Sequence, residues 1–190
     1  MKVFLITVFV LLNSSAICFA SENSEKNQPA NVIPVPQSVT TMNVQKTNSV
    51  LINPINFLSG GFGFEYQYAL TGNFVASVAP SWYYLKVKDG LNDEVKVSGG
   101  FLALGGSLYL NKPFEGWNIK LLAGVGYLSI SGYPSANMYM TDILGGYRWT
   151  WQSGFTMGLG IGARYLELNS DDVSVSGAGL AAELAIGIVF

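Results

Sequence analysis

The final segment of the chain alternates between two kinds of side chain, and this alternation constrains the fold more than any other feature of the sequence. A period of two is the signature of a β-strand whose two faces meet different surroundings. The segment therefore predicts a strand that has one apolar face and one small or polar face and ends on an aromatic residue. The apolar face holds Leu180, Ala182, Leu184, Ile186, Ile188 and Phe190, and the other face holds Gly179, Ala181, Glu183, Ala185 and Gly187.

The same alternation returns along the chain from about residue 48 onward, interrupted by turn signals such as Thr71–Asn73 and Gln152–Gly154. Pro54 lies inside the first segment, and proline is tolerated only at an edge or a bulge, so we expect that strand to be short or kinked. Loops are expected over 88–94, 131–137 and 169–172. The predicted strands cover about 49–57, 61–70, 74–86, 95–110, 117–127, 139–151, 155–165 and 173–190.

The length and spacing of these segments suit a membrane barrel. A tilted strand needs roughly ten residues to cross a bilayer, whereas no apolar run after residue 20 is long enough for a membrane helix. We therefore predict an all-β fold, an eight-stranded antiparallel up-and-down transmembrane β-barrel formed by residues 48–190. An even number of strands places both ends of the barrel on one side of the membrane. A soluble, lipocalin-like barrel is the alternative.

The first 47 residues read as processing and linker segments. Residues 1–20 combine Lys2, an apolar run over 3–12 and a small-residue end, which is typical of a secretory signal peptide cleaved after Ala20. Cys18 leaves a lipid-anchored form as an alternative. Residues 21–47 are polar and proline-rich, which predicts a flexible leader. A docking arm or a plug for the barrel is the functional alternative.

Composition excludes several classes of function. The chain has no histidine, and its one cysteine lies in the predicted signal peptide. We therefore expect no catalytic residue, no metal ligand and no cofactor site. Without Lys2 the chain has nine basic and twelve acidic residues, a net negative charge that gives no basic surface for nucleic acid.

Six charged residues fall on the face that alternation assigns to the barrel interior. Three are acidic and three are basic, so they sum to zero. Charges inside so narrow a barrel must pair or stay hydrated. We predict an internal charge network that fills the lumen; a gated ion path or a small-ligand site is the alternative. The six residues are Glu65, Lys120, Asp142, Arg148, Arg164 and Glu183.

Aromatic residues gather near both ends of the predicted strands, as rings do at the two interfaces of a membrane barrel. We predict two aromatic girdles, one near the end that holds the barrel termini and one near the opposite end. The girdle residues are Trp117, Trp149, Trp151 and Phe155 at the first end, with Phe74 and Phe190 nearby, and Trp82, Tyr84, Tyr127, Tyr139 and Tyr165 at the second.

The loops expected at that second end carry both signs of charge. Lysines there are suited to lipopolysaccharide phosphates, and carboxylates are suited to bridging divalent ions; a solvated loop with no ligand is the simpler interpretation. The residues are Lys86, Lys88, Asp89, Asp93, Glu94, Lys96, Glu167, Asp171 and Asp172.

The stretch from Leu51 to Gly61, with its Asn53-Pro54 pair and glycine-rich turn, and the following Glu65-Tyr66 and Ala69-Leu70 pairs, resemble the opening of a family of small Gram-negative outer-membrane barrels. Gln67 stands where that family pattern has a second acid. More broadly the chain resembles the OmpA and OmpX type of barrel without a peptidoglycan-binding domain. The resemblance implies an outer-membrane location with both termini in the periplasm, and it implies no reaction.

The resemblance also assigns a role to the last strand. In such barrels the C-terminal strand is the signal that the barrel-assembly machinery binds, which here implicates Leu184, Ile186, Ile188 and Phe190. The other partners implied are outer-membrane lipid and lipopolysaccharide, and we expect a monomer.

Two functional classes remain open at this stage. One is a structural or interaction barrel of the cell envelope, and the other is a narrow channel or ligand-binding barrel. A lipid A-modifying enzyme is a third and weaker hypothesis. The barrel enzymes of that kind use a histidine, which this chain lacks, so we expect no enzymatic activity.

Overall fold

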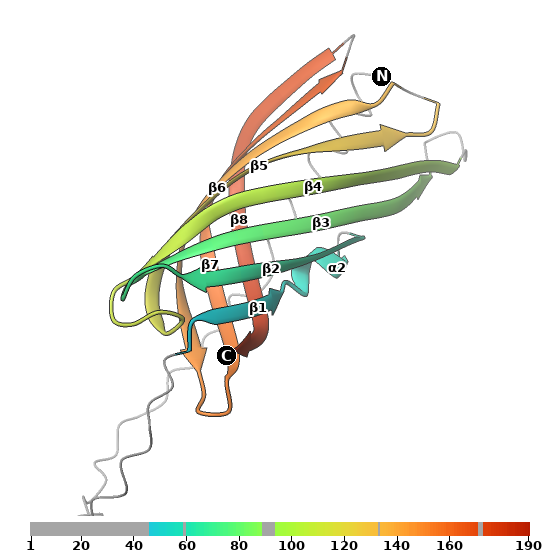
Figure 1. The fold of residues 1–190 in the computed structure, drawn as a ribbon. Coiled ribbons are helices and arrows are strands. Elements are labelled where there is room, and N and C mark those ends of the chain that lie inside the picture. The colour runs from blue at the N-terminus through green and yellow to red at the C-terminus, as the bar shows by residue number, and fades with distance from the viewer. Residues whose placement is uncertain (1–45, 59, 89–93, 133, 171–172) are drawn as a thin grey trace, which may run out of the picture.

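A computed structural model describes residues 46–58, 60–88, 94–132, 134–170 and 173–190. Eight antiparallel strands close into one barrel in sequence order (Figure 1), which confirms the predicted fold class. The only described helix, α2, is a single turn at Ile55–Leu58, so no helix in this part of the chain is long and apolar enough to cross a bilayer. The strands are β1 Asn48–Ile52, β2 Gly61–Ala69, β3 Phe74–Lys88, β4 Glu94–Tyr109, β5 Gly116–Ile130, β6 Ala136–Thr150, β7 Phe155–Ser170 and β8 Val173–Val189.

Backbone hydrogen bonds between the first and last strands close the barrel. The N–H of Asn48 donates to the carbonyl of Phe190 at 2.9 Å, and the N–H of Phe190 donates back to Asn48 at 2.9 Å. Register pairs then run from Ser49↔Val189 to Ile52↔Ile186. We call this end of the barrel, which also holds the turns after β2, β4 and β6, the base, and the opposite end the rim.

The first strand is shorter than predicted. The prediction of a strand over residues 49–57 is wrong beyond Ile52, where the chain turns into α2. Asn53 starts this turn, because its Oδ1 accepts a hydrogen bond from the N–H of Ile55 at 3.1 Å, and Pro54 between them has no N–H to offer a neighbouring strand.

All three predicted loops are shorter than expected, because strand pairing extends into them. Lys88 ends β3 and pairs with Glu94, which begins β4. Ala136 and Asn137, expected in a loop, begin β6, and Asn169 and Ser170 end β7. Asn137 pairs with Tyr127 on one side and with Asn169 on the other. Tertiary pairing therefore overrides the turn preference of asparagine. The predicted signal peptide, most of the leader and the loop acids Asp89, Asp93, Asp171 and Asp172 lie outside the described residues.

The outer surface of the base half is apolar. The large side chains that alternation assigns to the outward face are exposed there, up to 66% for Ile161. They form a continuous band on β4 to β8, with Leu102, Leu104, Leu108, Ile119, Leu121, Val125, Ile143, Leu159, Ile161, Leu180 and Ile188 among its members.

Polarity reverses in the rim half, which is formed by the long hairpins β3–β4, β5–β6 and β7–β8 rising above β1 and β2 (Figure 1). Many outward positions there are polar and exposed: Lys86, Lys96, Ser98, Asn137, Thr141, Ser174 and Ser176. Exposed aromatic residues stand among them: Tyr84, Tyr127, Tyr139 and Tyr165. Inward positions are apolar and buried in two clusters. The first begins at the level of the outward Leu102, Leu104 and Val125 and holds Phe101, Ala103, Leu122, Met138, Leu166 and Leu168. The second lies nearer the rim and holds Val95, Val97, Leu128 and Ile130. The end of the rim half thus has polar outward and apolar inward positions, as a water-soluble sheet does. The base half has an apolar outer surface around buried charged residues.

A third apolar cluster blocks the interior at the base. Val75, Tyr109, Phe114 and Val189 pack together from β3, β4, the β4–β5 turn and β8, and each is at most 4% exposed. The ring centroids of Tyr109 and Phe114 are 6.3 Å apart. We call this cluster the base plug; the charged residues lie between it and the apolar core of the rim half.

Candidate functional site

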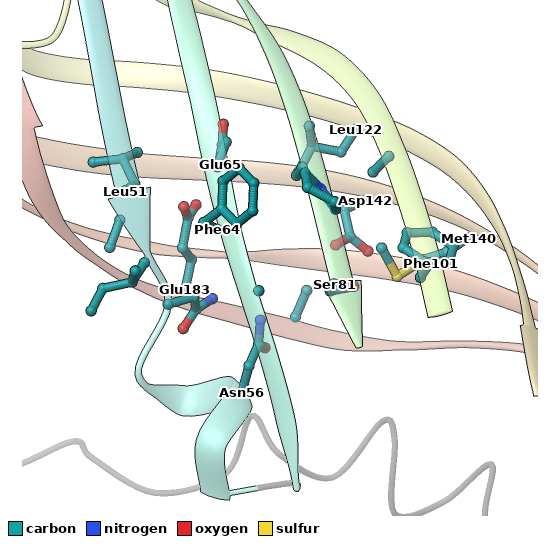
Figure 2. A pocket seen from close by; sticks show the side chains of 18 of the residues that line it. Leu51, Asn56, Phe64, Glu65, Ser81, Phe101, Leu122, Met140, Asp142 and Glu183 are labelled. Atoms are coloured by element: carbon teal, nitrogen blue, oxygen red, sulfur yellow. The ribbon is translucent and has the colours of Figure 1, made fainter. Parts of the chain in front are cut away.

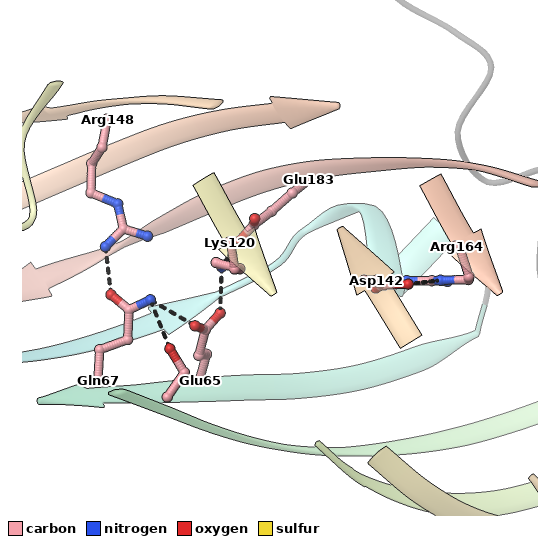
Figure 3. A network of polar contacts seen from close by, with 8 residues as sticks. Glu65, Gln67, Lys120, Asp142, Arg148, Arg164 and Glu183 are labelled. Carbon is pink, nitrogen blue, oxygen red and sulfur yellow. Dashed lines mark hydrogen bonds and ion pairs between the residues drawn. The ribbon is translucent and has the colours of Figure 1, made fainter. Parts of the chain in front are cut away.

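Lys120 is the centre of a charged layer above the base plug. Its ammonium Nζ lies 2.9 Å from Glu65 Oε2 and 2.6 Å from Glu183 Oε1 (Figure 3). The three side chains come from β5, β2 and β8, so one cation links three strands across the lumen. Lys120 is only 2% exposed, so it meets its partners where water screens the charges little.

Gln67 extends the layer from Glu65 to Arg148. Its Nε2 donates to Glu65 Oε1 at 2.6 Å and to the hydroxyl of Ser77 at 3.4 Å, and its Oε1 accepts from Arg148 Nη1 at 2.5 Å. Arg148 is 3% exposed, and its guanidinium carbon lies 5.7 Å from the centre of the Tyr109 ring. The layer thus holds two cations and two anions and is neutral.

Asp142 and Arg164 form a separate ion pair nearer the rim. They are register partners on β6 and β7, and the guanidinium donates two parallel bonds, Nε to Oδ1 and Nη2 to Oδ2, both at 2.7 Å. This fork geometry is the strong form of such a pair. The Arg164 side chain is 26% exposed and that of Asp142 is 4% exposed, so the arginine is the more accessible partner.

A cavity of about 90 Å³ lies between the charged layer and the Asp142–Arg164 pair (Figure 2). Glu65 and Glu183 line it at the layer, and Ser81, Tyr83 and Asn56 add polar groups. Most of the remaining wall is apolar: Leu51, Ala79, Phe101, Ala103, Leu122, Met140, Leu144, Ala181 and Ala185 belong to it.

The described residues of the predicted rim group lie on β3, β4 and β7. Lys86 is the register partner of Lys96, and Lys88 is that of Glu94. The backbone N–H of Lys96 donates to the Ser131 hydroxyl at 3.3 Å, and Glu167 accepts from the Asn169 amide at 2.7 Å. Lys86 is exposed. Nowhere in the described ranges do three or more metal-ligating side chains come together.

The aromatic residues of the predicted girdles are exposed on the outer surface. At the base the rings contact each other. The ring centroids of Trp117 and Tyr147 are 5.2 Å apart, those of Tyr147 and Trp149 are 4.8 Å apart, and those of Trp151 and Phe155 are 5.2 Å apart. Toward the rim, Trp82, Tyr84, Tyr127, Tyr139 and Tyr165 are between 44% and 59% exposed.

Sequence reasoning missed three parts of the interior: Gln67 as a member of the charged layer, the base plug and the apolar core of the rim half. Signals for the last were present. The inward Leu122 follows the outward Leu121, and the inward Leu128 and Leu166 follow the outward Tyr127 and Tyr165. Two consecutive apolar residues in a strand indicate that both of its faces are apolar at that point.

The strand topology and the apolar outer surface of the base half define the class. The protein is an eight-stranded up-and-down barrel with the apolar exterior of a transmembrane β-barrel. No family model matches the chain, and no curated protein matches it. Two solved structures of Ail from Yersinia pestis are similar to it. The crystal structure matches with a TM-score of 0.46 and 14% identity, and a backbone structure in a bilayer nanodisc matches with 0.43 and 15%; each match covers 77% of this chain and 100% of Ail. The class assignment therefore rests on the barrel's own topology and surface.

Proposed function

We propose that the protein is an integral outer-membrane barrel with a closed lumen that has a structural or interaction role in the cell envelope. The apolar band of the base half supports placement in hydrocarbon, because such a surface is costly in water and favourable in lipid. The aromatic residues at the base and below the polar rim would then lie at the two membrane interfaces.

The filled interior is the observation that carries the closed lumen. From the base upward a solute meets the base plug, then the charged layer, then the apolar core of the rim half. Lys120 is held by two carboxylates and Arg148 by Gln67. Moving either side chain aside would leave a charge unpaired in a region of low dielectric, which costs several kcal/mol.

The orientation of the barrel is part of the proposal. The start of β1 and the end of β8 meet at the base, so we place the base in the periplasm and the rim outside the cell. The C-terminal strand, ending at Phe190, would then be offered to the barrel-assembly machinery from the periplasm, and Lys86 and Lys96 would lie near lipopolysaccharide phosphates. We propose no enzymatic activity, because the sequence supplies no histidine as a general base.

Planar-bilayer recording tests the closed lumen. We expect the purified, refolded protein to give no channel events in bilayers where a refolded general porin conducts. Discrete, reproducible conductance steps from the pure protein would contradict the closed lumen and favour a narrow channel. The envelope role is tested in the source bacterium: a strain lacking the protein should become more sensitive to detergent, and unchanged detergent and antibiotic sensitivity would contradict that role.

A further inference from the structure

The cavity reaches the side wall of the barrel. Its lining includes inward residues such as Ala181 and Glu183, and it also includes Ile52, Phe64 and Ala182, which occupy the outward positions of their strands. A cavity bordered by both faces of the wall is open to the exterior surface at that point.

The strand pattern explains why the wall is open there. β1 ends at Ile52, whose partner is Ile186, so Leu184 and Ala182 further along β8 face no paired strand on that side within the described ranges. On the other side of β2, Gly63 pairs with Ser81 of β3 and Tyr66 pairs with Val78, but Phe64 and Pro80 between them are not paired. Pro80 has no N–H for that ladder. Gly61 to Gly63 therefore pair with β3 alone, and Phe64 pairs with Ile52 of β1 alone.

Apolar outward residues of β1 and β2 border the opening. Phe64 and Ile52 are 38% and 39% exposed, and Phe64 packs toward Trp82 with ring centroids 6.4 Å apart. If the barrel spans a membrane, as proposed above, a molecule reaches this opening from the hydrocarbon.

The lining restricts the chemistry of an occupant. Its charged groups are compensated: Asp142 by Arg164, and Glu65 and Glu183 by Lys120 together with Arg148. A charged guest would bring an unpaired charge into a low-dielectric space, which is strongly unfavourable. Apolar walls with a few convergent polar groups instead suit a guest with an apolar body and one neutral polar group.

We propose that this cavity binds an uncharged amphiphile, an alcohol with a short apolar body, that enters sideways from the membrane between β2 and β8. A water molecule needs roughly 10–15 Å³ of such space, so a cavity of about 90 Å³ takes about six to nine non-hydrogen atoms. The inference rests on the membrane placement proposed above and adds a ligand class to it.

Photolabelling with matched probes tests this site. The mature barrel in phosphatidylcholine vesicles is irradiated with pentanol carrying a diazirine, and labelled residues are mapped by mass spectrometry. We expect label on the segments 51–56 and 181–185, competition by excess pentanol, and at least tenfold less label from the matching pentanoate and pentylammonium probes.

Two variants separate the cavity from general exposure to lipid. Ala181→Leu fills the cavity from the inward face of β8 and should abolish the competed label. Ala178→Leu makes the same change at an exposed outward position of β8 that does not line the cavity, and should leave the label unchanged. Resistance to detergent before heating reports the folding of each variant.

Labelling that survives Ala181→Leu, or equal labelling by the charged probes, would overturn the site. Absence of competed label in wild-type protein that is shown by heat-dependent mobility to be folded in the vesicles would also overturn it while leaving the membrane placement intact. Failure of the protein to insert into vesicles at all would instead contradict the proposed function.

Discussion

Gln67 shows how much a single interior position must do. It accepts from Arg148 and donates to Glu65 and Ser77, so it needs an acceptor and a donor on one side chain. A carboxylate supplies only acceptors when ionised, so an amide meets both requirements and an ionised acid does not. Alternation assigns Gln67 and the six charges to one face, but it cannot say which of them meet, because contacts across a barrel depend on the stagger between strands.

Replacing Gln67 with glutamate therefore tests the layer. We expect Gln67→Glu to destabilise the folded barrel by about 1–3 kcal/mol, because Glu65 loses a donor and gains a like charge beside it. Urea titration in vesicles measures the change. Equal or higher stability would mean that a new contact with Arg148 dominates, and would contradict the role of Gln67 as a donor.

Removing the central cation should be more costly. Lys120→Met removes the cation that both carboxylates contact and leaves Glu65 and Glu183 with Arg148 alone as a counter-charge. We expect a loss of about 3–5 kcal/mol in the free energy of unfolding. Lys112→Met is the matched control, because Lys112 pairs with Glu115 at the surface, where its side chain is 65% exposed, and the expected loss is below about 0.5 kcal/mol. A small effect at both positions would show that the layer contributes little to stability.

At the scale of the elements, the strands are longer than a bilayer requires. β3 to β8 have 15 to 17 residues each, against roughly ten needed to cross. The sequence predicted the number, order and faces of the strands well, since period-two alternation is a local signal. It did not reveal that the surroundings change along each strand, because alternation shows that two faces differ and not which face meets water. Pro54 indicated that the first strand would be short or kinked, but it did not predict that β1 would end at Ile52.

The last strand supplies a prediction about assembly. Phe190 closes the barrel through backbone bonds to Thr47 and Asn48, and its side chain is 56% exposed. Deleting Phe190 should reduce the heat-modifiable folded form in cells several-fold, whereas Phe155→Ser, which removes an exposed ring at the same end, should reduce it much less. Similar amounts of folded protein from both variants in membrane fractions would contradict a special role for the terminal residue.

At the scale of the whole molecule, the barrel divides into two zones of opposite polarity. The base half has an apolar outer surface around the charged layer and the base plug, and the end of the rim half has polar outward positions around an apolar core. In the proposed membrane placement, the surroundings of this continuous sheet change from hydrocarbon to water between the two zones. The charged layer lies within the base half, and the cavity borders it. The surroundings of both therefore depend on where the boundary between hydrocarbon and water falls along the barrel.

Cysteine accessibility along the outer surface tests this boundary most directly, and the predicted mature chain contains no cysteine to interfere. Single cysteines replace Leu104 and Ile161 in the base half and Ser98 and Ser176 in the rim half, and intact cells are treated with a membrane-impermeant maleimide. Rapid modification at 98 and 176 with protection at 104 and 161 is the predicted result. Equal modification at all four positions in the folded protein would contradict a barrel whose lower half is surrounded by lipid.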